Sequence, residues 1–284
     1  MPTMGYHHSA RRYLVAVARG TRCSPPRRAQ ETEQAAVSLE KPLVGRQREC
    51  ALLWQHIEGA GSGRTQVSLL AGEPGIGKTH LLDATATRAS AAGAHVLRGG
   101  AFDAEGMPPY LPFLEALGQH IRNTPFEALR AQAGAVAPIL ATILPELSVQ
   151  LGDSPPAYPL PPEQARMRLY EAVGSFLAAI AAPHALVLIL DDLHWSDPGS
   201  LDLLCYIARQ QPAARLLILG AYRAGEVADR PAFERALAEL NRLRVLDTIA
   251  VGPLAEAEIA TFAAHTLGGP VDATLGQLLV DQSE

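Results

Sequence analysis

The sequence predicts an α/β fold in which helices cover both faces of a parallel, five-stranded sheet. Segments of helical periodicity alternate with five short apolar runs, at residues 67–71, 95–98, 185–190, 215–221 and 245–251. The runs LVLIL (186–190) and LLIL (216–219) lack polar alternation, which is typical of strands buried on both faces. Strands separated by helices form parallel sheets through right-handed crossovers, and this order of elements therefore defines the fold class.

Two of the predicted helices show the pattern clearly. The first carries an amphipathic stripe of Leu169, Val173, Phe176, Leu177 and Ile180. The second is expected to start at Asp197 and Pro198, because an aspartate N-cap followed by proline is a frequent helix start. Between the second and third strands, residues 101–165 predict a helical, proline-rich insertion, since residues 152–162 contain five prolines, which neither a helix nor a central strand tolerates.

Length and composition exclude several classes of protein. The 284 residues suffice for one large domain or two smaller ones, and 48% hydrophobic against 19% charged residues indicates a globular chain. A net charge of −5 argues against a polyanion-binding protein. Three cysteines without C-x-x-C spacing argue against disulfides or zinc and favour the reducing cytoplasm. No run of 18 apolar residues is present, so we expect no membrane-spanning helix.

Residues 1–40 are expected to form a disordered basic tail, because their hydrophobic density is low. The first 30 residues contain six Arg and no acid, a charge of +6 that leaves −11 for the remainder. The alternatives are an organelle transit peptide, a basic arm that touches nucleic acid or anionic lipid, and a start codon assigned too early.

Residues 72–79, GEPGIGKT, match the phosphate-binding pattern G-x-x-x-x-G-K-[ST] in full. They lie between a predicted strand (67–71) and a predicted helix (78–92), which is the context that this loop requires. Its glycines let successive N–H groups converge on phosphate oxygens, and the helix N-terminus adds its dipole. The expected nucleotide-binding residues are Gly72, Glu73, Pro74, Gly75, Ile76, Gly77, Lys78, Thr79 and the adjacent His80.

Two residues of this loop carry charge and metal chemistry. Lys78 is one of two lysines beside 22 arginines, and we expect its ammonium to contact the β- and γ-phosphates. The Thr79 hydroxyl is expected to ligate Mg²⁺.

Asp191 and Asp192 follow the buried run LVLIL directly. An acid at a strand tip beside such a loop holds Mg²⁺ through its water shell, the role we expect for Asp191. Asp192 is then placed to orient or deprotonate the attacking water, whereas capping of the next helix is the alternative for this pair. His194 and Trp195 come next, with no catalytic role assigned.

Arg223 ends the run LGAYR (219–223). Ligands of open α/β folds bind at the carboxyl edge of the sheet, where this arginine could sense or stabilise the γ-phosphate. A solvated arginine at a strand end is the alternative.

Four strings taken together resemble the ATPase module of AAA-type (STAND) signal-transduction ATPases: VGR at 44–46 with Glu49, GEPGIGKT, LILDDLHWSD and LGAYR. Such modules stand at the front of large LuxR-type transcriptional regulators and of some multidomain nucleotide cyclases. The resemblance covers about residues 41–284, and DDLHW-x-D is its most specific part. It implies ATP with Mg²⁺, slow hydrolysis, and a switch coupled to self-association or to partner domains.

The resemblance also implies residue roles. Val44, Gly45 and Arg46 would lie near the adenine, and Arg223 would be the sensor arginine after the fourth strand. Asp192 replaces the Glu common in other AAA-type ATPases, which implies modest turnover.

By the same resemblance, the ATPase domain spans residues 41–253, and an incomplete helical lid spans residues 254–284. Gly252-Pro253 is expected to be a strand-to-helix turn, followed by helices at 255–267 and 271–280. The G-N-P element and the helix-turn-helix of such regulators do not occur before Glu284. We therefore expect a truncated product or an excised module without direct DNA binding.

Two other functions stay open. An incomplete lid suits a regulatory or scaffolding module that binds nucleotide without turnover. A small-molecule or nucleoside kinase is the third candidate, although neither an arginine-rich lid nor an acceptor site is evident.

Overall fold

The computed structural model describes residues 43–104, 106–152, 160–210, 213–267 and 269. The chain divides into two units, Met1–Pro42 and Leu43–Glu284, and every described residue belongs to the second. The expectations for the basic tail at residues 1–40 and for a helix at 271–280 lie outside the described residues.

A five-stranded parallel sheet forms the centre of this unit, in the order β2-β3-β4-β1-β5. The strands are β1 (Gln66–Gly72), β2 (His95–Gly100), β3 (Leu186–Asp191), β4 (Leu216–Arg223) and β5 (Leu246–Ala250). All five apolar runs are strands, and the predicted fold class is confirmed. The strand β2 extends two residues beyond the apolar run, and Arg223 is the last residue of β4, as the run LGAYR predicted.

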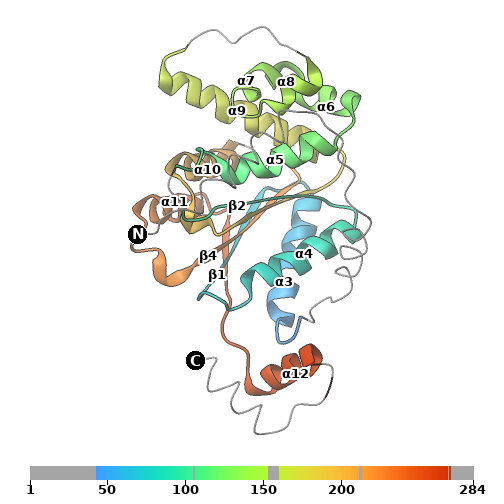
Figure 1. Cartoon of the computed structure of the whole chain (residues 1–284), viewed down its shortest axis with the longest axis vertical. Helices are drawn as coiled ribbons and strands as arrows, with labels where there is room; N and C mark the ends of the chain where they lie inside the picture. The colour runs from blue at the N-terminus through green and yellow to red at the C-terminus, as the bar shows by residue number, and fades with distance from the viewer. Residues whose placement is uncertain (1–42, 105, 153–159, 211–212, 268, 270–284) are drawn as a thin grey trace, which may run out of the picture. The chain divides into compact units, whose positions relative to one another are not determined.

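Helices cover both faces of the sheet (Figure 1). One face packs against α3 (Gln47–Gly61) and α4 (Lys78–Ala91). The other packs against α5 (Leu111–Asn123), α9 (Pro162–Ala181), α10 (Pro198–Gln210) and α11 (Pro231–Arg242). Short 3₁₀ turns follow two strands, η3 (Leu193–Trp195) after β3 and η4 (Ala224–Glu226) after β4, and α12 (Glu256–Leu267) follows β5.

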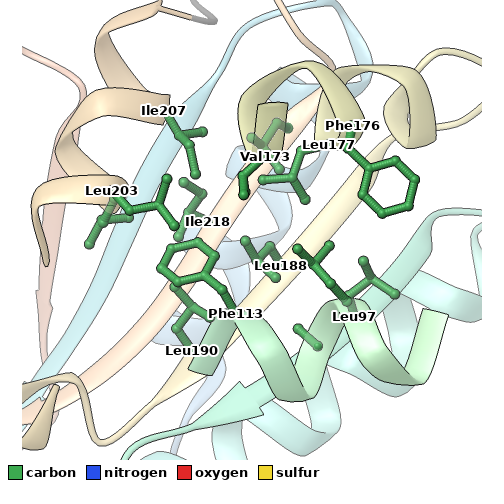
Figure 2. Close-up of a cluster of buried hydrophobic side chains, with 14 of the residues drawn as sticks. Leu97, Phe113, Val173, Phe176, Leu177, Leu188, Leu190, Leu203, Ile207 and Ile218 are labelled. Carbon is green, nitrogen blue, oxygen red and sulfur yellow. The ribbon is translucent and has the colours of Figure 1, made fainter. Parts of the chain in front are cut away.

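The side chains of strand β3 belong to the hydrophobic cores on both faces of the sheet. Its side chains alternate, with Leu186, Leu188 and Leu190 in the core on one face and Val187 and Ile189 in the core on the other. Figure 2 shows the first core, where Leu188 and Leu190 lie near Phe113 of α5 and side chains of α9 and α10. Full burial of each such side chain stabilises the fold by about 1.5–3 kcal/mol, which explains why this run is apolar throughout.

Between β2 and β3, the described residues form α5, α6 (Phe126–Ala133), η2 (Gly134–Val136), α7 (Ala137–Leu140), α8 (Glu146–Leu151) and α9. Residues 153–159 of the predicted proline-rich stretch lie outside the described residues. Two prolines between β2 and β3 stand at helix starts, Pro112 in the first turn of α5 and Pro162 as the first residue of α9. In the first turn, proline removes an N–H that has no partner within the helix in any case.

The predicted start of α10 is confirmed by its cap. Asp197 Oδ1 accepts a hydrogen bond from the backbone N–H of Ser200 at 3.1 Å, which satisfies a free donor of the first turn. The predicted stripe on α9 is buried along its whole length. Among the described helices, none is long and apolar enough to cross a membrane.

Candidate nucleotide-binding site

The register of the sheet brings the predicted site residues to one edge. Gly72, the last residue of β1, is paired with Arg223 of β4, and Asp191 of β3 is paired with Gly100 of β2. Because the strands are parallel, these ends lie together at the carboxyl edge, where open α/β sheets bind ligands.

The loop between β1 and α4 has the backbone conformation that its glycines permit. Gly75 and Gly77 have φ angles of 78° and 97°, in the left-handed region that residues with a Cβ rarely adopt. Gly77 is also the N-cap residue of α4. The free N–H groups of the first helical turn therefore adjoin the loop and can donate to an anion.

Lys78 lies buried beneath this loop, with 7% of its surface exposed. Its Nζ donates to the carbonyl oxygens of Gly72 and Glu73, both at 2.8 Å. Burial lowers the pKa of Lys78, while the charge of Asp192 acts in the opposite direction. The loop thus holds a cation at the position where phosphate groups are expected.

The two residues after Lys78 differ in their surroundings. Thr79 is exposed, which leaves its side chain accessible to a ligand. His80 is half-buried, and its Nε2 atom is buried without a hydrogen-bond partner among the described residues.

Asp191 is held on both carboxylate oxygens. Oδ1 accepts the backbone N–H of Asp192 at 3.0 Å, and Oδ2 lies 3.2 Å from Nη2 of Arg98. Arg98 also pairs with Asp83 of α4. Sequence reasoning missed Arg98, although a charged residue inside a predicted strand next to the acid-bearing strand is a signal that could have found it.

Asp192 has a left-handed backbone conformation, with φ 51° and ψ 43°. Such a conformation is uncommon for residues other than glycine and is frequent at functional sites. Burial, followed by the neighbouring charge of Asp191, raises the pKa of Asp192. This carboxylate is therefore more basic than an ordinary aspartate.

Arg223 makes an ion pair with Glu226 of η4, with Nη1 2.7 Å from Oε1. The hydrogen bond from Arg223 lowers the pKa of Glu226. Glu226 was not predicted as a site residue, although its spacing of three residues from Arg223 could have indicated a pair. Trp195 lies close by. The centroid of its ring is 4.0 Å from the guanidinium carbon of Arg230 and 5.9 Å from that of Arg223.

The segment Val44–Arg46 is tied to the phosphate loop through Arg46. Its Nη2 donates to the carbonyl of Ile76 at 3.0 Å, and its Nη1 pairs with Glu49 at 3.2 Å. Gly45 has φ +72°, and a Cβ there would lie 2.5 Å from Cδ of Glu258 in α12. The helix α12 therefore lies close to this segment through Glu258, which the sequence did not single out.

A pocket of about 390 Å³ adjoins the aspartate pair at the ends of β2 and β3. Its lining includes Arg98, Glu115, Gln119 and Phe102, and residue Phe102 is 53% exposed. The pocket offers polar groups of both signs beside Asp192.

The donor set fits a Mg²⁺ ion shared with phosphate groups. In the part of the chain that the structure describes, no cluster of three or more His, Cys, Asp or Glu could hold a metal unaided. Thr79 and Asp191 are oxygen donors, the type that Mg²⁺ prefers, and this ion usually keeps waters and substrate phosphates as its other ligands.

A second constellation resembles a hydrolytic triad and is not one. Ser68 Oγ lies 2.6 Å from Nδ1 of His56, whose Nε2 lies 2.9 Å from Oδ2 of Asp247. Ser68 is 0% exposed, so no substrate can reach its hydroxyl. This row ties α3 to β1 and β5.

The parallel sheet, the GEPGIGKT loop and the aspartate pair at the sheet edge define a P-loop nucleotide-binding module. The family model described as "AAA ATPase domain" matches residues 42–219, more than half of the chain. The chain belongs to this AAA ATPase family.

Similar proteins include a long bacterial relative. An uncharacterized protein of Rhizobium meliloti (strain 1021) is 28% identical over 190 residues, which are 59% of this chain and 17% of that protein. The chain thus spans less than a fifth of that relative.

Among solved structures, Cdc6p from Pyrobaculum aerophilum is 15% identical, with a TM-score of 0.46 over 86% of this chain and 56% of that one. AMPPCP-bound DnaA from Aquifex aeolicus is 13% identical, with a TM-score of 0.44 over 84% and 57% of the two chains.

Proposed function

We propose that this chain is an ATP-binding switch module that hydrolyses ATP slowly with Mg²⁺. The observation that carries the proposal is the convergence of Lys78, Asp191, Asp192 and Arg223 around the phosphate loop. The charges of Asp192, Arg223 and Asp191 all act on the Lys78 ammonium, so these groups lie within electrostatic reach of one another.

Each group has a role that follows from its chemistry. The backbone N–H groups of residues 72–79, except Pro74, which has none, bind the phosphates, and the Lys78 ammonium exchanges its loop carbonyls for β- and γ-phosphate oxygens. Val44, Gly45 and Arg46 lie on the adenine side, a role supported by the hydrogen bond from Arg46 to Ile76. His80, the residue after Thr79, completes the binding set.

Thr79 and Asp191 would hold Mg²⁺, which when bound supplies positive charge at the phosphate oxygens. Asp192 orients the attacking water and accepts its proton, and its raised basicity suits this role. Arg223 donates to the γ-phosphate from the end of β4. Aspartate in place of the more common glutamate is consistent with slow turnover.

The proposed setting is a LuxR-type transcriptional regulator of the cytoplasm, in which nucleotide state controls self-association or partner domains. The strings LILDDLHWSD and LGAYR support this setting by resemblance. Residues 41–253 would be the ATPase domain, and residues 254–284 would belong to a helical lid. This chain would not contact DNA directly.

The test is phosphate release from MgATP by the purified chain. We expect slow release in the wild-type protein and background release in Asp192→Asn, which should still bind ATP. Asp202→Asn, on an exposed position of α10, is the matched control and should release phosphate as the wild type does. ATP binding with no phosphate release would overturn the ATPase and leave a regulatory module without turnover.

The pocket beside Asp192 favours a second candidate, phosphoryl transfer to a small hydroxylated acceptor. In hydrolysis, one inorganic phosphate appears for each ADP. In transfer, the γ-phosphoryl group moves to the acceptor oxygen, and ADP then exceeds inorganic phosphate when acceptors are added. A ratio of one in the presence of sugars and nucleosides contradicts the kinase.

A further inference from the structure

His194 is a fully buried histidine beside the proposed site, and its ring has no hydrogen-bond partner in the part of the chain that the structure describes. It lies in η3 directly after β3, and its side chain is 0% exposed. Neither Nδ1 nor Nε2 has a hydrogen-bond partner among the described residues. Buried polar atoms nearly always have a hydrogen-bond partner. We therefore expect the ring to gain such a partner in another state of the site, for example when a nucleotide is bound.

Two carboxylates flank this ring just beyond hydrogen-bonding distance. Nδ1 lies 3.9 Å from Oδ1 of Asp192, and Nε2 lies 3.6 Å from Oε2 of Glu226. Burial, together with nearby Arg223, Lys78 and Arg230, lowers the pKa of His194 to about 4, despite the opposing charge of Glu226. The ring is therefore neutral at pH 7, with one N–H to donate.

Glu226 connects the ring to Arg223. Its Oε1 accepts the hydrogen bond from Arg223 at 2.7 Å, while its Oε2 faces Nε2 of His194. In this arrangement the hydrogen bond of the Glu226 carboxylate is made with Arg223 and not with His194. If Arg223 turns to a γ-phosphate, the Glu226 carboxylate loses its hydrogen-bond donor. A partly buried carboxylate without a donor raises the free energy of the complex.

We propose that His194 is a positioning residue for the triphosphate: its Nε2–H takes over Glu226 when Arg223 moves to the γ-phosphate. The inference rests on the proposed function, because it assigns Arg223 to that phosphate. His194 thereby lowers the free energy needed to separate Arg223 from Glu226. This effect occurs only with a nucleotide that has a γ-phosphate. The pair His194–Glu226 makes the site discriminate ATP from ADP.

The test compares affinities for the Mg²⁺ complexes of AMPPCP and ADP by calorimetry. His194→Phe keeps a ring of similar shape without a donor, and we expect its preference for AMPPCP over ADP to fall about tenfold, the effect of one hydrogen bond to a charged group. His194→Gln keeps an N–H donor and should restore most of the preference. His184→Phe, an exposed histidine before β3, is the matched control and should keep it fully.

A double-mutant cycle separates this exchange from a general packing role. Glu226→Gln removes the ion pair with Arg223, so adding His194→Phe to it should change the preference little. An equal loss in both backgrounds would assign His194 a packing role and overturn the inference.

Trp195 provides a readout that does not depend on affinity. In a Trp54→Phe background, AMPPCP should change Trp195 emission, because Arg223 leaves the neighbourhood of the ring, whereas ADP should not. An unchanged preference in His194→Phe, or equal emission changes with both nucleotides, overturns the inference while the proposed function stands. If the wild-type chain binds neither nucleotide, the proposed function fails, and the inference fails with it.

Discussion

Arg98 Nη2 lies 3.2 Å from Oδ2 of Asp191, so a strand-borne cation already contacts the carboxylate proposed to hold Mg²⁺. The same guanidinium pairs with Asp83 on α4, the helix that starts in the phosphate loop. Asp83 is four residues after Thr79, and positions four apart share one face of a helix. Arg98 thus connects the two elements that carry the proposed metal ligands.

Replacing Arg98 should change the Mg²⁺ requirement of ATP binding. Arg98 and Mg²⁺ compete for one carboxylate, so Arg98→Gln should lower the Mg²⁺ concentration for half-maximal ATP binding by about threefold, as expected for loss of a nearby, partly screened charge. The measurement is a Mg²⁺ titration at fixed fluorescent ATP analogue. Arg64→Gln, at an exposed position before β1, should leave the titration unchanged. A higher requirement in Arg98→Gln would show that orientation of Asp191 outweighs competition.

Gly45 should not tolerate a side chain. Its φ is +72°, and a Cβ would meet the Glu258 carboxylate at 2.5 Å. We expect Gly45→Ala to lower the free energy of unfolding by about 1–2 kcal/mol, as measured by urea denaturation. Adding Glu258→Ala should recover the part of this loss that is steric. Gly61→Ala, where a Cβ meets no atom within 4 Å, is the control; an equal loss there would contradict the steric explanation.

The buried His194 should make the fold sensitive to acid. Its pKa is about 4 in the folded chain against 6.5 for the free side chain, so the unfolded chain binds more protons between these values. Stability from this group is complete above pH 6.5 and is lost as the pH falls toward 4. Between pH 7.5 and 5 we expect the free energy of unfolding to fall by about 2 kcal/mol more in the wild type than in His194→Gln. Parallel pH profiles from urea denaturation would contradict this assignment.

The strands were predictable because burial on both faces leaves a continuous apolar run. The end of β2 was not, because Gly99 and Gly100 have none of the side chains that favour strands. These residues are extended because Gly99 pairs with Leu190 and Gly100 pairs with Asp191 of β3. Strand register, which depends on tertiary packing, decides such ends.

In the candidate site, too, local sequence predicts some features, whereas contacts between distant segments could not be predicted. The positions of Lys78 and Thr79 could be predicted because the loop and the helix that carries them are contiguous in sequence. The contacts of Arg98 with Asp191 and of Glu258 with Gly45 join segments far apart in the chain, and no local pattern specifies them. The burial of His194 depends on the left-handed backbone conformation of Asp192. The short apolar run before Asp192 does not predict this conformation, so the burial of His194 could not be predicted from the sequence.

The assignment of residues 72–79 as the nucleotide site is tested by the binding of MgATP to Lys78→Ala. We expect the wild-type chain to bind MgATP in isothermal titration calorimetry and Lys78→Ala to lose at least about a hundredfold in affinity, since the buried cation proposed to bind phosphate is removed. Arg64→Ala should bind as the wild type does, and circular dichroism should show that all three proteins are folded. Undiminished affinity in a folded Lys78→Ala protein would contradict the assignment of this loop as the nucleotide site.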